Sequence, residues 1–99
     1  MIDNGSRLES RVCDTQVIVV KSSEALDDLR CGGQAMVPIG TGADRTEPDP
    51  AFAAGAVLGK RYVHDSGAEV LVTRSGVGSL SVGATVLGYK QAAQLPASD

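Results

Sequence analysis

Thr15-Gln-Val-Ile-Val-Val-Lys21 and Glu69-Val-Leu-Val-Thr-Arg74 are the two stretches of this sequence that decide its fold. Both contain several β-branched residues, whose side chains lose little freedom on a pleated strand. The consecutive apolar residues of the first stretch are typical of a strand that is covered on both faces. We therefore predict a mainly β fold built around strands at 15–21 and 69–74.

Shorter strand signals surround these two stretches. The strands that we predict from them lie at 35–39, 56–58, 61–63, 79–82 and 85–89. Asp65-Ser-Gly67 has the composition of a turn, and Ser75-Gly-Val-Gly78 is expected to close a hairpin. The fold class that follows is one of short antiparallel strands and hairpins.

The remaining segments are expected to be less regular. One short helix is predicted at 24–29, with Ser22 or Ser23 as its N-cap and Cys31-Gly-Gly33 as its end. Residues 1–10 are polar and are expected to fray. The stretch 40–55 contains prolines and acids and has little to bury, so we interpret it as a linker; a functional loop is the alternative.

Length and charge narrow the class of protein. Ninety-nine residues make a single domain, 1–99, with a modest apolar interior. The net charge is −3 and the basic residues are scattered, whereas nucleic-acid binding needs positive charge gathered on one face. No signal peptide is visible, and the apolar run 17–20 is far too short to cross a membrane. We expect a cytoplasmic protein without nucleic-acid or membrane partners.

The two halves of the chain resemble each other. The matching blocks are Val17-Ile-Val-Val-Lys-Ser22 with Val70-Leu-Val-Thr-Arg-Ser75, and Leu29-Arg-Cys-Gly-Gly-Gln-Ala-Met36 with Leu80-Ser-Val-Gly-Ala-Thr-Val-Leu87. We interpret them as an internal repeat, 5–39 and 56–90, joined by the linker 40–55. A duplication of this kind predicts two similar β-units packed about a pseudo-twofold axis.

The repeat resembles desulforedoxin, a small rubredoxin-knuckle iron protein. That family pairs a Cys-x-x-Cys-Gly turn with a later Leu-x-Cys-Cys-Gly-x-Pro-Met turn. Leu29-Arg-Cys-Gly-Gly-Gln-Ala-Met36 fits the later turn, with Gly32 in place of its second cysteine and Ala35 in place of its proline. Cys13 stands at the second cysteine of the first turn, and Ser10 at the first.

The second half matches the family in its strand and turn pattern, from Gly59 to Leu80. Its ligand positions are lost, and Ser66 and Val82 occupy two of them. The resemblance implies a knuckle fold in which four thiolates hold one iron ion in a tetrahedron. One copy of this chain supplies two cysteines, so the resemblance speaks for the fold more than for the iron chemistry.

Cys13, Cys31 and His64 are the candidate metal ligands. A structural zinc or iron site takes four thiolate or imidazole ligands, because these soft metals favour a closed tetrahedron. The two thiols would be completed by His64 and Asp65, or by a twofold-related chain that contributes its own pair. The alternative is that both cysteines are small buried hydrophobic residues and, in a reducing compartment, free thiols.

Three functions follow from the sequence. The first is a non-catalytic accessory or interaction module, whose exposed strand edges pair with another copy or a partner protein. The second is a Cys-dependent iron or zinc protein; no other cofactor is expected. The third is a small enzyme in which His64, beside Asp65, acts as a base, although a histidine at a turn is also a common surface residue.

Overall fold

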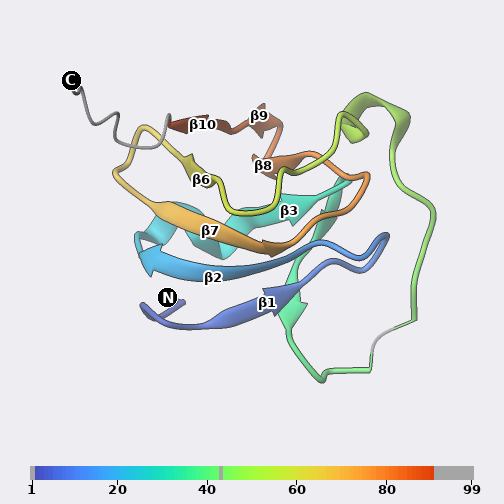
Figure 1. The fold of residues 1–99 in the computed structure, drawn as a ribbon, viewed down its shortest axis with the longest axis horizontal. Coiled ribbons are helices and arrows are strands. Elements are labelled where there is room, and N and C mark those ends of the chain that lie inside the picture. Colours follow the sequence, from blue (N-terminus) through green and yellow to red (C-terminus); the bar gives the residue numbers. More distant parts are fainter. Residues whose placement is uncertain (1, 43, 91–99) are drawn as a thin grey trace.

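A computed structural model describes residues 2–42 and 44–90 and shows ten short β-strands in two antiparallel sheets (Figure 1). The strands are β1 (Arg7–Glu9), β2 (Gln16–Lys21), β3 (Leu29–Cys31), β4 (Gln34–Ala35), β5 (Val37–Pro38), β6 (Arg61–Val63), β7 (Glu69–Arg74), β8 (Leu80–Val82), β9 (Thr85–Val86) and β10 (Gly88–Lys90). The prediction of a mainly β protein is confirmed.

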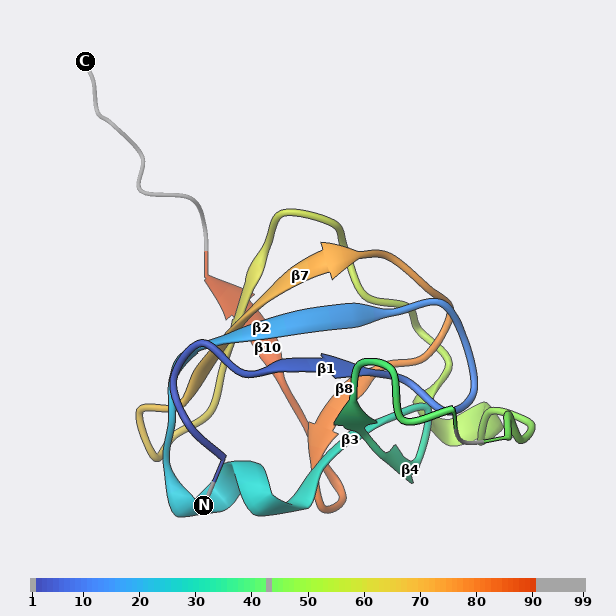
Figure 2. The same cartoon turned by 90° about the horizontal axis from the view of Figure 1, so that it is seen from below.

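The six-stranded sheet has the order β10-β6-β7-β2-β1-β5, and the four-stranded sheet has the order β4-β3-β8-β9. Figure 2 shows β3, β4 and β8 of the smaller sheet below β7 and β2 of the larger one. The first five strands and the last five occupy mirrored places in these two orders. In both sheets the central ladder, β2–β7 or β3–β8, joins the first half of the chain to the second.

The register of the central ladders follows the sequence match between the halves. Ile18 lies opposite Leu71, and Arg30 lies opposite Ser81, so matched residues face each other. Two backbone hydrogen bonds are equivalent under the same match between the halves. Gly32 N–H donates to the Ser79 carbonyl at 3.0 Å, and Gly83 N–H donates to the Asp28 carbonyl at 3.1 Å. Two β-units related by a pseudo-twofold axis would have this arrangement. The duplication itself stays a prediction.

The core lies between the two sheets. Val17 and Val19 of β2 are buried on the same face as Val70 and Val72 of β7, all at 2% exposure or less. Each such side chain contributes about 1.5–3 kcal/mol relative to an exposed position. Ile18, between them, is half-buried, so the prediction that β2 is covered on both faces is wrong. The reason is that the second sheet packs against only one face.

Two features of the first half differ from the prediction. Arg7–Glu9 does not fray but forms β1, because it pairs with β2 on one side and β5 on the other and buries Leu8. The predicted helix is a 3-10 turn, η1 (Glu24–Asp28), with Ser23 as N-cap: its Oγ accepts from Ala25 N–H at 3.2 Å. Among the described residues no helix is long and apolar enough to cross a membrane.

Two glycine-containing segments, Gly32-Gly33 and 75–78, have a different structural role from the predicted one. Gly32 and Gly33 do not end a helix; they form the turn between β3 and β4, with φ of +64° and +87°. The stretch 75–78 does not close a hairpin, because β7 is already paired on both sides, with β2 and β6. It carries the chain from the larger sheet to the smaller one.

Three predicted strands are absent or divided in the structure. Ala56 forms a single bridge with Gly76, and no strand covers 56–58. The segments 35–39 and 85–89 each divide into two strands that belong to different sheets. The chain bends at Met36 and Leu87, whose N–H groups donate to the carbonyls of Leu29 and Leu80, respectively.

The stretch 40–55 is bound to the two sheets and the turn 10–15 by several backbone hydrogen bonds. Thr46 N–H donates to the Arg11 carbonyl and Asp49 N–H to the Gly32 carbonyl, both at 2.9 Å. The short turn η2 (Pro50–Phe52) follows, and its last carbonyl accepts from Ser79 N–H at 2.7 Å. The green segment in Figure 1 thus follows the outside of the sheets and contacts both halves.

Candidate functional site

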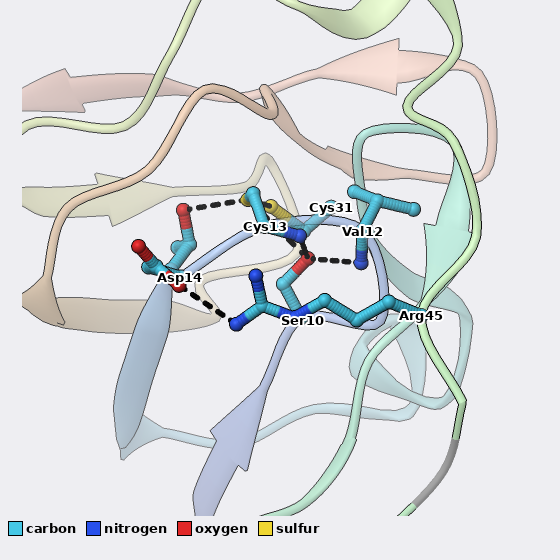
Figure 3. Close-up of polar contacts among 7 residues, drawn as sticks. Ser10, Val12, Cys13, Asp14, Cys31 and Arg45 are labelled. Atoms are coloured by element: carbon cyan, nitrogen blue, oxygen red, sulfur yellow. Dashed lines mark hydrogen bonds and ion pairs between the residues drawn. The ribbon is translucent and has the colours of Figure 1, made fainter.

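Cys13 and Cys31 lie side by side, with 3.8 Å between their sulfur atoms (Figure 3). Cys13 belongs to the turn 10–15 between β1 and β2, and Cys31 is the last residue of β3. Both are free thiols, exposed by 6% and 0%, respectively. The fold therefore brings together two cysteines that are distant in sequence and buries them at one point.

The turn 10–15 is shaped around the side chain of Ser10. Its Oγ accepts hydrogen bonds from the N–H groups of Val12, at 3.0 Å, and Cys13, at 3.2 Å. The Cys13 sulfur lies 3.4 Å from Ser10 Oγ and 3.3 Å from Thr15 Oγ1. A thiol donates to these hydroxyls, and a thiolate accepts from them, so either protonation state has partners.

Two glycines of the stretch 75–78 pack directly against the sulfurs. A Cβ atom added at Gly76 would lie 2.8 Å from the Cys13 sulfur, and one added at Gly78 would lie 2.8 Å from the Cys31 sulfur. These distances are too short for a real contact, so the backbone approaches this closely only because neither residue has a side chain. The second half of the chain thus forms one wall of the cysteine site.

The neighbouring groups give the two thiols different pKa values. Burial by itself raises the pKa of Cys13, but hydrogen bonds from Ser10, Thr15 and the Gly78 backbone outweigh it and lower the pKa to about 7. Burial raises the pKa of Cys31 to about 11, and the neighbouring charge of Cys13 adds to this effect. At pH 7 about half of Cys13 is therefore thiolate, whereas Cys31 keeps its proton.

Cys13 is reached from outside through a small hollow of about 80 Å³. The residues that line it are Glu9, Ser10, Cys13, Asp14, Thr15, Gln16, Arg45 and Arg74. Arg45 comes from the stretch 40–55 and is held over the turn by an ion pair with Asp14 at 2.7 Å (Figure 3). The sequence did not single out Arg45 or Arg74, because an isolated arginine in a polar segment or at a strand end carries no distinguishing signal.

His64 is not part of this site. It lies in the turn between β6 and β7, near the Lys21–Glu69 end of the central ladder, whereas Cys13 lies at the Gln16–Arg74 end. Its Nδ1 is 2.9 Å from Ser66 Oγ and accepts from the Ser66 N–H at 3.1 Å, so the ring stabilises its own turn. The structure thus unites two of the three predicted ligands and separates the third.

The two sulfurs alone would suit a tetrahedral metal ion. Thiolates bound at about 2.3 Å on a tetrahedron are about 3.8 Å apart, which matches the observed spacing. Of the two other ligand positions in the resembled site, one holds Ser10, which would offer its hydroxyl. The other holds Gly32, which has no side chain to bind a metal. A Cβ atom at Gly32 would collide with the side chain of Val12. The residues of one chain therefore do not fit a closed four-thiolate site.

The described ranges 2–42 and 44–90 contain no cluster of three or more Cys, His, Asp or Glu side chains suited to a metal ion. The spacing of the two sulfurs thus favours iron or zinc binding, whereas the residues at the two other ligand positions, Ser10 and Gly32, do not.

A second surface feature lies beside β10. It is a groove of about 440 Å³, lined by Ala54, Gly55, Val57, Tyr62, Ser79, Leu80, Val86, Leu87, Gly88 and Tyr89. Val57, Val86 and Tyr89 are 43–53% exposed there, which is high for apolar side chains. Tyr62 fixes the groove wall: its hydroxyl accepts from Val57 N–H at 2.9 Å, and its ring meets that of Tyr89 edge-on at 5.4 Å.

The resemblance to desulforedoxin stays a prediction from the sequence. Comparisons of this chain with protein-family models, curated proteins and solved structures found no match.

Proposed function

We propose that this protein is a non-catalytic interaction module, and that its partner at β10 is a second copy of the same chain. The observation that carries the proposal is the apolar groove beside β10, the last strand of the larger sheet. An edge strand presents unpaired backbone donors and acceptors, and the neighbouring apolar side chains add surface to bury. Together they favour the addition of another strand.

The opposite edge of the sheet is protected. Ile39 N–H donates to the Arg7 carbonyl at 3.1 Å, so the residue before it, Pro38 of β5, turns its nitrogen toward the outside. Proline has no hydrogen to donate there, which discourages pairing at that edge. In β10 the corresponding residue is Tyr89, whose backbone keeps its donor. The two ends of the sheet therefore differ in their capacity to bind a strand.

A second copy is the simplest partner for β10. An antiparallel pair of identical strands is self-complementary about a twofold axis, so each donor meets an acceptor. The cation of the strand, Lys90, is already paired with Glu69 at 2.9 Å. Lys90 therefore brings no unpaired charge to the contact between two copies of β10, while Lys60 lies over the Tyr89 ring at 5.5 Å.

Light scattering on the purified chain tests this proposal. We expect the mass of a dimer for the wild type at tens of micromolar, and the mass of a monomer for Val86→Lys, which adds a charge to the groove. Ile39→Lys is the matched control, because Ile39 is a comparably exposed apolar residue at the protected edge; it should remain a dimer. A wild-type chain that stays monomeric at millimolar concentration would contradict the proposal.

A further inference from the structure

We propose that Cys13 and Cys31 form a thiol–disulfide exchange pair, in which Cys13 attacks a small-molecule disulfide and Cys31 resolves the intermediate. The proposal concerns a different part of the molecule from the β10 groove and does not depend on it. It starts from the contact between the two sulfurs, 3.8 Å, and from the unequal access to them. Cys13 lines the hollow, whereas Cys31 lies fully buried behind it.

The hollow decides which sulfur reacts first and with what. Cys13 lines the hollow and Cys31 does not, so an incoming disulfide meets Cys13 first. The volume of about 80 Å³ admits one end of a small molecule but not a protein segment. The lining carries two cations, Arg45 and Arg74, and two carboxylates, Glu9 and Asp14, and Asp14 is paired with Arg45, so the size of the hollow rather than its charge limits what can enter. A small disulfide is therefore the substrate class that fits.

The different acidities of the thiols support the same order of events. A thiolate is the attacking species in exchange, and Cys13, with a pKa of about 7, supplies it at neutral pH. Cys31, with a pKa of about 11, is protonated until Cys13 has reacted. Once the Cys13 sulfur is in a mixed disulfide its charge is gone, which removes one of the causes that raise the pKa of Cys31.

The reaction balances without any further reactant. The Cys13 thiolate attacks one sulfur of R–S–S–R, forms a Cys13–S–S–R bond and releases RS⁻. Cys31 then loses its proton and attacks the Cys13 sulfur, which forms the Cys13–Cys31 bond and releases the second RS⁻. The protein dithiol is oxidised by two electrons and the small disulfide is reduced to two thiols.

The final bond requires a modest movement. A disulfide has a sulfur–sulfur distance of about 2.05 Å, so the two atoms must approach by about 1.8 Å. Cys31 is held in β3 between β4 and β8, whereas Cys13 lies in the turn 10–15. The turn therefore supplies the movement.

The reaction with dithiobis(nitrobenzoate), a small aromatic disulfide, tests the proposal. For the wild type we expect two coloured thiolates released per chain and a protein mass lower by two hydrogens, with no reagent retained. Cys31→Ser should release one thiolate and retain the other half of the reagent on Cys13. Cys13→Ser should react about 100-fold more slowly at pH 7, because the thiolate fraction of Cys31 is about 5,000-fold lower and its greater nucleophilicity offsets only part of this.

Several results would overturn the inference. One is a wild-type product that retains reagent on either cysteine, and another is a disulfide that links two chains on a non-reducing gel. Equal first-release rates for the wild type and Cys13→Ser would show that Cys13 is not the preferred nucleophile. The wild-type mass measurement stands without any variant, so it remains decisive even if a substitution at the buried Cys31 prevents folding.

Discussion

Glu69 on β7 is bound to Lys90 on β10 across the strand that separates them, with 2.9 Å between the carboxylate and the ammonium group. Arg61 on the intervening β6 contacts the other carboxylate oxygen at 3.3 Å. The Glu69 side chain is 4% exposed and its two partners are about half exposed. The carboxylate of Glu69 therefore links the edge strand β10 and its neighbour β6 to β7 in the middle of the larger sheet.

The free energy of unfolding should fall in acid because of Glu69. The hydrogen bond from Lys90, together with the charges of Lys90 and Arg61, lowers the pKa of Glu69 from its usual value of 4.5. A lowered folded-state pKa stabilises the protein above the unfolded-state pKa, and this stabilisation is lost as the pH falls through the folded-state value. Urea unfolding at pH 6 and pH 3 should show a loss that Glu69→Gln makes smaller.

At pH 6 we expect Glu69→Gln to cost about 1 kcal/mol, because a buried charge-assisted hydrogen bond is lost. Asp28→Asn is the matched control, since the Asp28–Arg30 ion pair is exposed at both ends. It should change the free energy of unfolding by less than about 0.5 kcal/mol. Equal effects of the two substitutions would argue against a special role for Glu69.

Gly76→Ala should destabilise the protein by about 1–3 kcal/mol, because the new methyl group meets the backbone nitrogen and hydroxyl of Thr15 and the Cys13 sulfur. The neighbouring atoms belong to packed backbone and buried side chains, which cannot turn away. Thermal unfolding measures the effect. Gly88→Ala has open space around its added methyl and should leave the melting temperature nearly unchanged.

Thr15→Val should raise the pKa of Cys13 by about one unit, because it keeps the shape of the side chain but removes a hydroxyl that donates to the thiolate. The pH dependence of the alkylation rate of Cys13 by iodoacetamide gives this value directly. For the wild type we expect a midpoint near pH 7. An unchanged midpoint in Thr15→Val would mean that the backbone donors alone set the acidity.

Ser10→Cys should convert the cysteine pair into a zinc or iron site. Ser10 Oγ lies 3.4 Å from the Cys13 sulfur, so the substitution places a third sulfur beside the first two. We expect metal far below one per chain in the wild type, and a zinc affinity at least about tenfold higher in the variant. Elemental analysis after dialysis against a weak chelator compares them. Ser66→Cys, at the position of the second half that matches Cys13, should bind no more than the wild type.

The sequence was most informative where β-branched residues are concentrated. Glu69–Arg74 and Arg61–Val63 are strands with the predicted bounds, and 16–21 differs from its prediction by one residue. These segments owe their structure to local preference and to burial of alternate residues, which are valines in β2 and β7 and Tyr62 in β6. Leu8 shows the limit of this reasoning: one apolar residue in a polar segment carries no periodic signal, yet pairing with two other strands makes it part of the core.

The sequence predicts the two cysteines of the candidate site but not their contact in space. Cys13 and Cys31 were identified by their chemistry, whereas their contact depends on how β3 and the turn 10–15 meet in space. Composition predicted a hairpin at 75–78, but the two flanking strands pair elsewhere, and its glycines instead close over the sulfurs. Arg45 reaches the hollow only because the stretch 40–55 lies against the domain, a tertiary contact that polar composition does not report.

The two central ladders have a consequence for how this chain acquires its structure. Each joins the first half to the second, and the interior of each half is completed by valines and leucines of the other. Neither half therefore has a hydrophobic interior of its own, and the segment between them acts as a tether that raises the effective concentration of one for the other. Cutting the tether near residue 43 should leave two peptides that are unstructured when diluted and that recover the fold when mixed at high concentration.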